Sequence, residues 1–128
     1  MTITLNDNVR RLIDGPNFAV LATTNADGSP QTSVLWITRD GDDVLFCTAR
    51  GRRKERNIAR DPRVSLTVID DANGYDYAEI RGIATVTEQG GRELANELSH
   101  KYQDTDFPDE PADVVRVVVR ISPEHVVG

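Results

Sequence analysis

The side chains best suited to chemistry form a cationic cluster between Thr48 and Pro62. Residues 50–60 contain six Lys or Arg and one Glu, a net charge of +5, whereas the whole chain carries −6 and the remainder therefore −11. The pattern predicts a short helix that follows a strand and ends at Asp61-Pro62, since the residue before proline avoids the helical region. A helix N-terminus already presents partial positive charge, so further cations there favour a bound anion.

The cluster offers several donors to a phosphate. Arg52 and Arg56 would be neighbours one helical turn apart, which aligns their guanidinium forks along one face. The candidate anion ligands are Thr48, Gly51, Arg52, Arg53, Lys54 and Asn57. The competing interpretation is a solvated helix face whose arginines pair with nearby carboxylates. Charge alone leaves both open.

No other residues form a catalytic set. His100 and His125 have no partner at metal-ligand spacing, and we expect one in a polar helix face and the other in a C-terminal tail. Cys47 lies within a predicted strand, where a buried, inert thiol is expected, although facing arginines would lower its pKa. The chain has no nucleophile elbow and no phosphate-binding glycine motif. We therefore expect no catalytic side chain and no metal site, and reactive atoms supplied by a cofactor.

The elements around the cluster are mostly strands joined by tight turns. Hydrophobic alternation and turn residues predict strands at 18–24, 31–38, 44–48, 64–69, 75–86 and 114–121, helices at 5–14, about 51–60 and 92–102, and a polar loop at 103–113. Gly82 inside a long strand predicts a bulge. Six hairpin-linked strands with two or three short helices indicate a mainly β (α+β) antiparallel barrel.

Bulk composition limits the partners. A chain of 128 residues with 38% hydrophobic residues fits a single domain, 1–128. The acidic balance argues against general binding of nucleic acid or anionic membranes, which need broad positive surfaces. Strands 18–24 and 114–121 carry apolar residues on both faces, which predicts a partner subunit. The N-terminal residues lack a signal-peptide pattern, so we expect a cytoplasmic protein.

Three segments resemble a known family. They are residues 51–64 (GRRKERNIARDPRV), 27–33 (DGSPQTS) and 78–84 (AEIRGIA). Their order and spacing are similar to those of the pyridoxamine 5'-phosphate oxidase-like split β-barrel family, above all its PPOX-class F-420-dependent members, the B group of flavin/deazaflavin oxidoreductases. The resemblance implies a six-stranded antiparallel split β-barrel that binds its cofactor at a homodimer interface.

The resemblance also implies a site. In the family, the strand matching Gln31, Thr32, Ser33, Val34 and Trp36 runs beneath the tricyclic ring of the cofactor. The segment matching Thr48, Arg52 and Lys54, with Arg53 and Asn57 in support, grips the cofactor phosphate. Residues matching Tyr75, Tyr77 and Glu79 would come from the second protomer.

The implied activity is hydride transfer from reduced F-420 to a small unsaturated or conjugated organic acceptor, with loops 70–77 and 103–113 shaping specificity. One alternative is an FMN-binding reductase or oxidase of the same fold. Another is a non-catalytic module that uses the basic helix to bind RNA or protein. The acidic remainder and an aromatic content of only 5% disfavour that module.

Overall fold

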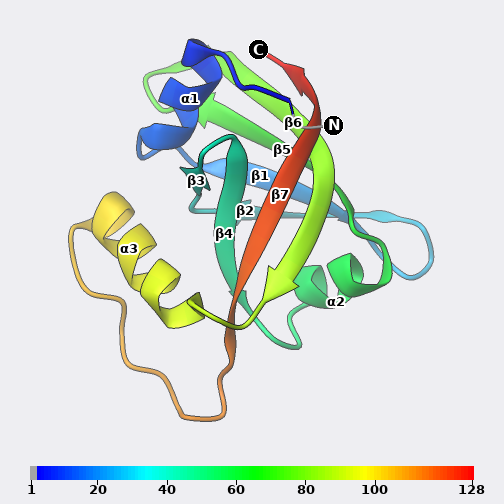
Figure 1. Cartoon of the computed structure of the whole chain (residues 1–128), viewed down its shortest axis with the longest axis vertical. Coiled ribbons are helices and arrows are strands. Elements are labelled where there is room, and N and C mark those ends of the chain that lie inside the picture. The colour runs from blue at the N-terminus through cyan, green and yellow to red at the C-terminus, as the bar shows by residue number, and fades with distance from the viewer. Residues whose placement is uncertain (1–2) are drawn as a thin grey trace.

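A computed structural model describes residues 3–128 as seven strands and three helices (Figure 1). In chain order these are α1 (Asp7–Asp14), β1 (Ala19–Thr24), β2 (Pro30–Leu35), β3 (Thr38–Asp40), β4 (Asp43–Ala49), α2 (Arg53–Arg60), β5 (Arg63–Asp70), β6 (Asn73–Thr87), α3 (Gly91–Gln103) and β7 (Arg116–Val127). The mainly β character and the three short helices confirm that part of the sequence prediction.

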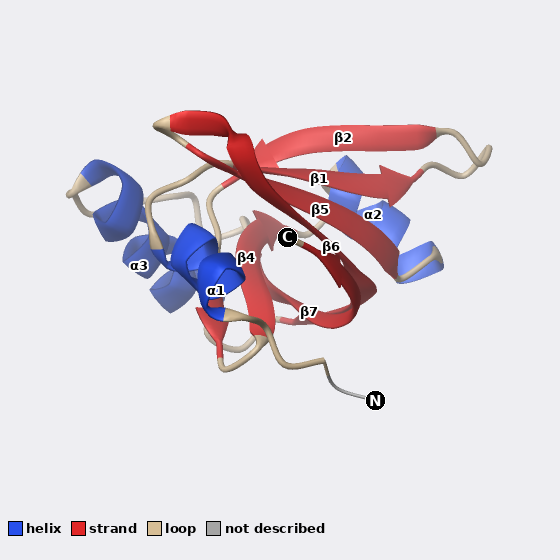
Figure 2. Ribbon diagram, turned by 90° about the horizontal axis from the view of Figure 1, so that it is seen from above, coloured by secondary structure: helices blue, strands red, loops and turns tan. Residues whose placement is uncertain are grey.

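The seven strands form one antiparallel sheet in the order β2-β1-β5-β6-β7-β4-β3. The sheet curves strongly, with β1, β2 and β5 on one side of the molecule and β4 and β7 on the other (Figure 2). Its two edge strands, β2 and β3, follow one another in the chain. The two residues between them therefore carry the backbone from one edge of the sheet to the other.

The prediction of six strands, with one continuous strand over 31–38, is wrong at this point. β2 ends at Leu35 and pairs with β1, whereas β3 begins at Thr38 and pairs with β4. Trp36 and Ile37 form the bend between them. Within residues 3–128, β2 and β3 form no ladder with one another, so hydrogen bonds do not close the sheet into a complete barrel.

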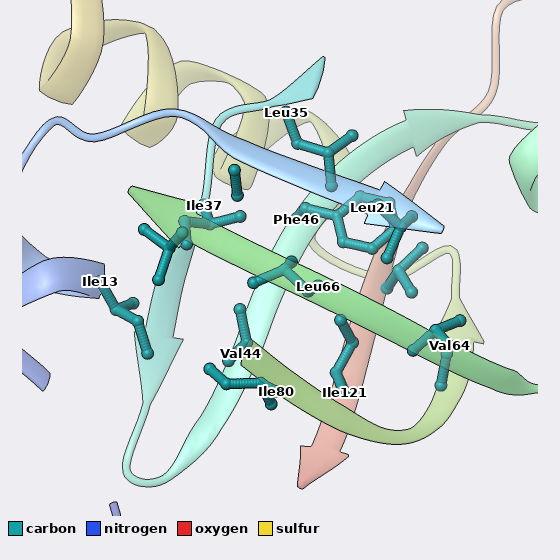
Figure 3. Close-up of a cluster of buried hydrophobic side chains, with 14 of the residues drawn as sticks. Ile13, Leu21, Leu35, Ile37, Val44, Phe46, Val64, Leu66, Ile80 and Ile121 are labelled. Atoms are coloured by element: carbon teal, nitrogen blue, oxygen red, sulfur yellow. The ribbon is translucent and has the colours of Figure 1, made fainter. Parts of the chain in front are cut away.

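The inner face of the curved sheet holds one hydrophobic core (Figure 3). Alternate residues of each strand point into it, as period-two patterning requires. Val117, Val119 and Ile121 of β7 are completely buried and form part of this core. Phe46 of β4 is the largest completely buried side chain among the described residues.

Gly82 marks a bulge in β6, as its position in the sequence predicts. The register of β6 against β7 shifts between Arg81 and Gly82. A Cβ atom at Gly82 would lie 2.1 Å from the carbonyl oxygen of Ser122, so only glycine allows this approach. Beyond the bulge β7 continues to Val127 and pairs His125 with Arg81, so the predicted C-terminal tail is a strand.

The helices occupy the ends of the curved sheet. α2 packs against β1 and β6, and α3 packs against β4 and β7, with α1 and α3 drawn toward one end and α2 toward the other (Figure 2). Among residues 3–128, no helix has the length and apolar character needed to cross a membrane. The chain between α3 and β7 runs outside the sheet beneath α3 in the view of Figure 1.

Candidate functional site

The start of α2 is organised by a carboxylate from within the helix. Glu55 is nearly buried, and its carboxylate accepts the backbone N–H of Gly51 at 2.8 Å. It also pairs with Arg50 at 3.3 Å. Gly51 has a φ of +89°, the left-handed conformation that glycine adopts without strain. Glu55 therefore supplies part of the negative charge that the helix N-terminus favours.

The remaining cations of the cluster fall into two groups. Arg50 pairs with both Glu55 and Glu88, and Arg60 donates to the backbone carbonyl of Thr24. In the part of the chain described, the other four cations, Arg52, Arg53, Lys54 and Arg56, take part in no salt bridge. Pairing with nearby carboxylates, as the solvated-face interpretation requires, thus accounts for Arg50 alone among the described contacts.

Two of these cations, Arg52 and Lys54, border a pocket of about 170 Å³. It is lined by Val34, Leu35, Trp36, Cys47, Thr48, Arg52, Lys54, Ala95, Leu98, Phe107 and Arg116. The end of β2, the end of β4, the start of α2, one face of α3 and the loop before β7 all contribute. Five of the residues predicted for the site therefore meet here: Val34, Trp36, Thr48, Arg52 and Lys54.

The pocket is electropositive. Burial lowers the pKa of the half-buried Lys54 below its ordinary value, and the charges of Arg52 and Arg116 lower it further. The nearby carboxylate of Glu110 is held by Arg116 in a two-pronged contact at 2.8 and 2.7 Å. A hydrogen bond from Arg116 lowers the pKa of Glu110, so this group stays charged as the counterion of Arg116.

The other predicted site residues lie elsewhere. Gln31 and Arg53 border a separate, open depression beside the β1–β2 turn. Asn57 is completely buried, and its amide donates to Thr23 Oγ1 at 2.9 Å and to Asn25 Oδ1 at 3.0 Å. Its side chain thus anchors α2 to β1. The predicted contacts of Gln31, Arg53 and Asn57 with a cofactor stay predictions.

Three further predicted residues differ in their surroundings. Thr32 is exposed on β2, and Tyr77 on β6 is 53% exposed and outside the pocket. The hydroxyl of Ser33 is buried and has no hydrogen-bond partner among residues 3–128. An unpaired buried hydroxyl is costly, which makes this atom a candidate for a contact that the single chain does not supply.

Sequence reasoning missed Phe107 and Arg116. Arg116 is largely buried, and its guanidinium lies 4.9 Å from the centroid of the Phe107 ring. Arg116 could have been found only from the pairing of strands. β4 pairs with β7, and Arg116 lies opposite Ala49, next to the cationic cluster. Nothing local in the sequence marks Phe107, because its contact is with a strand that begins after the loop.

Cys47 lines the same pocket and is half-buried. Burial raises the pKa of its thiol, and this effect outweighs the lowering by Arg116. The thiol therefore stays protonated near neutral pH, which suits a wall residue better than a nucleophile.

This arrangement can bind an anionic group beside a flat, apolar one. Arg52, Lys54 and the hydroxyl of Thr48 provide donors at one end, and the rings of Trp36 and Phe107 provide aromatic surface. Phosphate-bearing molecules with a planar ring system have both features. The donor set thus fits a flavin or deazaflavin phosphate.

Comparison with known proteins agrees with the fold and motifs. Residues 5–128 match the family model described as pyridoxamine 5'-phosphate oxidase. The chain is similar to the solved structure of an F420 reductase, with a TM-score of 0.85 and 30% identity over 96% of this chain and 98% of that one.

Two more distant structures show the fold alone. A conserved hypothetical protein from Mycobacterium tuberculosis has a TM-score of 0.77 and 22% identity, over 98% of this chain and 84% of its own. General stress protein 26 from Bacillus anthracis has a TM-score of 0.72 and 22% identity, over 97% and 92%. With the full-length family match and the F420 reductase likeness, the chain belongs to the pyridoxamine 5'-phosphate oxidase-like split β-barrel family.

Proposed function

We propose that this protein is an F-420-dependent oxidoreductase that transfers a hydride from the reduced deazaflavin to a small unsaturated or conjugated organic acceptor. The observation that carries the proposal is the pocket in which two cations without carboxylate partners, Arg52 and Lys54, meet the Trp36 ring. The 30% identity to an F420 reductase over nearly the full length of both chains supports the choice of cofactor.

In this proposal the role of the protein is to bind the cofactor and the acceptor and to orient them toward each other. When bound, the reduced deazaflavin would supply a hydride to the acceptor, whose reduction would be completed by a proton from solvent. Arg52, Lys54 and Thr48 would hold the phosphate, while Trp36 and Phe107 would shield the flat ring from water. Hydride transfer needs the reacting carbons held face to face, so orientation and exclusion of water account for the catalysis without a reactive side chain.

We further propose a homodimer that completes the site. A pocket of about 170 Å³ is small for a drug-sized ligand, since such sites usually span roughly 300–1,000 Å³. Val34 borders this pocket and also an apolar depression formed with Phe18, Val20 and Ile69. We call Phe18, Val20, Val34 and Ile69 the outer apolar face. A second copy seated on this face would border the pocket and extend it.

Titration with the two candidate cofactors tests the proposal. Trp36 is the only tryptophan, so its fluorescence reports directly on a ring bound beside it. We expect F-420 to quench this fluorescence with saturable, tight binding, and FMN to bind more weakly. Tight binding of FMN without binding of F-420 would replace the proposal with an FMN-dependent reductase or oxidase.

A double substitution tests the anion ligands. We expect Arg52→Ala with Lys54→Ala to weaken cofactor binding by about 2 to 4 kcal/mol, because each charge-assisted hydrogen bond contributes roughly 1.5–3 kcal/mol. The control is Arg56→Ala with Arg63→Ala, which removes the same charge from exposed residues outside the pocket. Equal losses in both double variants would mean that only net charge matters, and the site assignment would fail.

A further inference from the structure

The bend at Trp36 and Ile37 has unusual backbone bonding. It joins the two edge strands of the sheet, β2 and β3, and belongs to neither ladder. The Ile37 side chain is completely buried, so the polar groups of its backbone need partners within the protein.

Both partners come from the last turns of α3. The backbone N–H of Ile37 donates to the hydroxyl of Tyr102 at 3.1 Å, and its carbonyl accepts from Nζ of Lys101 at 2.6 Å. Lys101 also donates to the carbonyl of Ile13, the penultimate residue of α1. Two consecutive side chains of one helix therefore replace the ladder bonds that the bend lacks.

Tyr102 also contacts Trp36. The two rings stack with centroids 5.5 Å apart and planes 12° apart. The Tyr102 ring is itself fixed by its hydroxyl, which donates to the carbonyl of Asn17 at 2.6 Å, and by the Phe18 ring at 5.7 Å. Burial raises the pKa of Tyr102, which keeps the hydroxyl a donor. Tyr102 does not line the pocket, whereas Trp36 does.

We propose that Tyr102 is the positioning residue for Trp36: its stacked ring and its hydrogen bond to the Ile37 peptide hold the indole in place as one wall of the pocket. The inference rests on the proposed function in one respect, that the cofactor ring lies against this indole. The position of Trp36 in the ligand-free protein can be measured independently.

The test compares Tyr102→Leu, which removes both the stack and the hydroxyl, with Tyr102→Phe, which keeps the stack. In Tyr102→Leu we expect the tryptophan band of the near-ultraviolet circular dichroism spectrum to shrink by about half and the acrylamide quenching constant to rise about threefold, since the aromatic partner no longer covers the indole. Tyr102→Phe keeps the stack but loses the hydrogen bond to Ile37, so its band should fall between those of wild type and Tyr102→Leu.

A control separates this effect from general loosening of α3. Leu94 is a buried residue of α3 outside the pocket, and Leu94→Ala removes packing without touching the stack. We expect its tryptophan band and quenching constant to match the wild type. Similar changes in Leu94→Ala and Tyr102→Leu would overturn the assignment of a specific role to Tyr102.

Amide exchange provides a second readout, which holds even if Tyr102→Leu does not fold. In Tyr102→Phe the Ile37 N–H loses its acceptor, so we expect its hydrogen exchange to accelerate by roughly tenfold. Unchanged exchange at Ile37, or an unchanged tryptophan signature in folded Tyr102→Leu, would overturn the proposal.

Cofactor binding gives the last comparison. Tyr102→Leu should weaken F-420 binding by about tenfold while leaving Arg52 and Lys54 intact, because a displaced wall no longer orients the ring. If wild-type protein bound neither F-420 nor FMN, the proposed function would fail, and the ligand-free spectra would still decide the role of Tyr102.

Discussion

Lys54 and Lys101 are both half-buried, but their surroundings give them different behaviour. Lys54 faces a pocket shared with Arg52 and Arg116, so its charge is disfavoured until an anion arrives. Lys101 instead donates to two backbone carbonyls, those of Ile13 and Ile37. The first lysine is suited to binding a ligand and the second to holding the fold together.

The lowered pKa of Lys54 predicts that anion binding weakens as pH rises. A bound phosphate favours the charged amine, so binding is accompanied by proton uptake at pH values around and above the lowered pKa, and affinity falls as pH rises through that range. We expect a decrease of roughly tenfold, the loss of one charge-assisted contact. Isothermal titration in buffers of different ionisation enthalpy measures the uptake. Lys54→Arg keeps its charge, so a similar pH dependence in that variant would contradict the prediction.

Lys101 predicts a pH dependence of stability. Burial lowers its pKa in the folded protein to about 8, against 10.5 for an ordinary lysine. Between these values the unfolded chain holds one more proton than the folded protein, so the free energy of unfolding should rise with pH. Denaturant titrations of wild type and Lys101→Met measure the difference. A difference between the free energies of unfolding of the two proteins that is the same at every pH reports the lost hydrogen bonds. If this difference does not grow between pH 8 and 10, the predicted titration of Lys101 is wrong.

At the scale of elements, the loop between α3 and β7 is fastened to the strand that follows it. Glu110 contacts Arg116 at 2.7 Å and Arg92 of α3 at 3.8 Å, and Phe107 lies against the Arg116 guanidinium. This set of contacts holds one aromatic wall of the pocket. Changes within the loop would therefore alter the shape of the pocket without altering the sheet.

Substitution of Glu110 should loosen this loop. In Glu110→Gln the two-pronged contact with Arg116 loses its charge, so we expect amide exchange over residues 105–113 to accelerate by roughly tenfold. Exchange in β4 and β7 should stay unchanged. Asp109→Asn is the matched control, because Asp109 is an exposed neighbour in the same loop. A loop equally protected in Glu110→Gln would show that the ion pair does not hold it.

Predictability from sequence follows the range of the interactions. The Asp27-Gly28 turn and the Gly82 bulge are marked by local residues, and both lie where the sequence predicts. The split between β2 and β3 depends on Lys101 and Tyr102, more than 60 residues away, and no local pattern marks it. The cationic residues of the pocket were predictable because, like the turn, they are marked by their neighbours in the sequence. Phe107 was not predictable, because its place in the pocket depends on contact with Arg116 of β7.

For the whole molecule, the outer apolar face is the clearest sign of a partner. Val20 and Val34 are direct cross-strand neighbours, and Val34 is 66% exposed. Phe18 is 52% exposed beside them. The side chains of this face point away from the hydrophobic core, which lies on the other side of the sheet. The segment at 18–24, predicted to be apolar on both faces, therefore exposes one of these faces on the surface of the single chain.

A charge placed on this face should prevent assembly. We expect Ile69→Asp to raise the dissociation constant of the proposed homodimer by about a hundredfold or more, because an unpaired carboxylate is costly to bury. Light scattering coupled to size-exclusion chromatography measures the change. Val127→Asp is the control, since Val127 is exposed at the end of β7, outside the outer apolar face. A dimer undisturbed by Ile69→Asp would place the interface elsewhere.

Glu55 determines how the start of α2 is stabilised in the ligand-free protein. By binding the Gly51 amide and Arg50 from within α2, it neutralises the beginning of that helix with a residue of the chain itself. The scaffold therefore does not depend on an incoming phosphate in order to fold. Under the proposed function, a site built in this way would accept and release its cofactor without rearranging the start of α2.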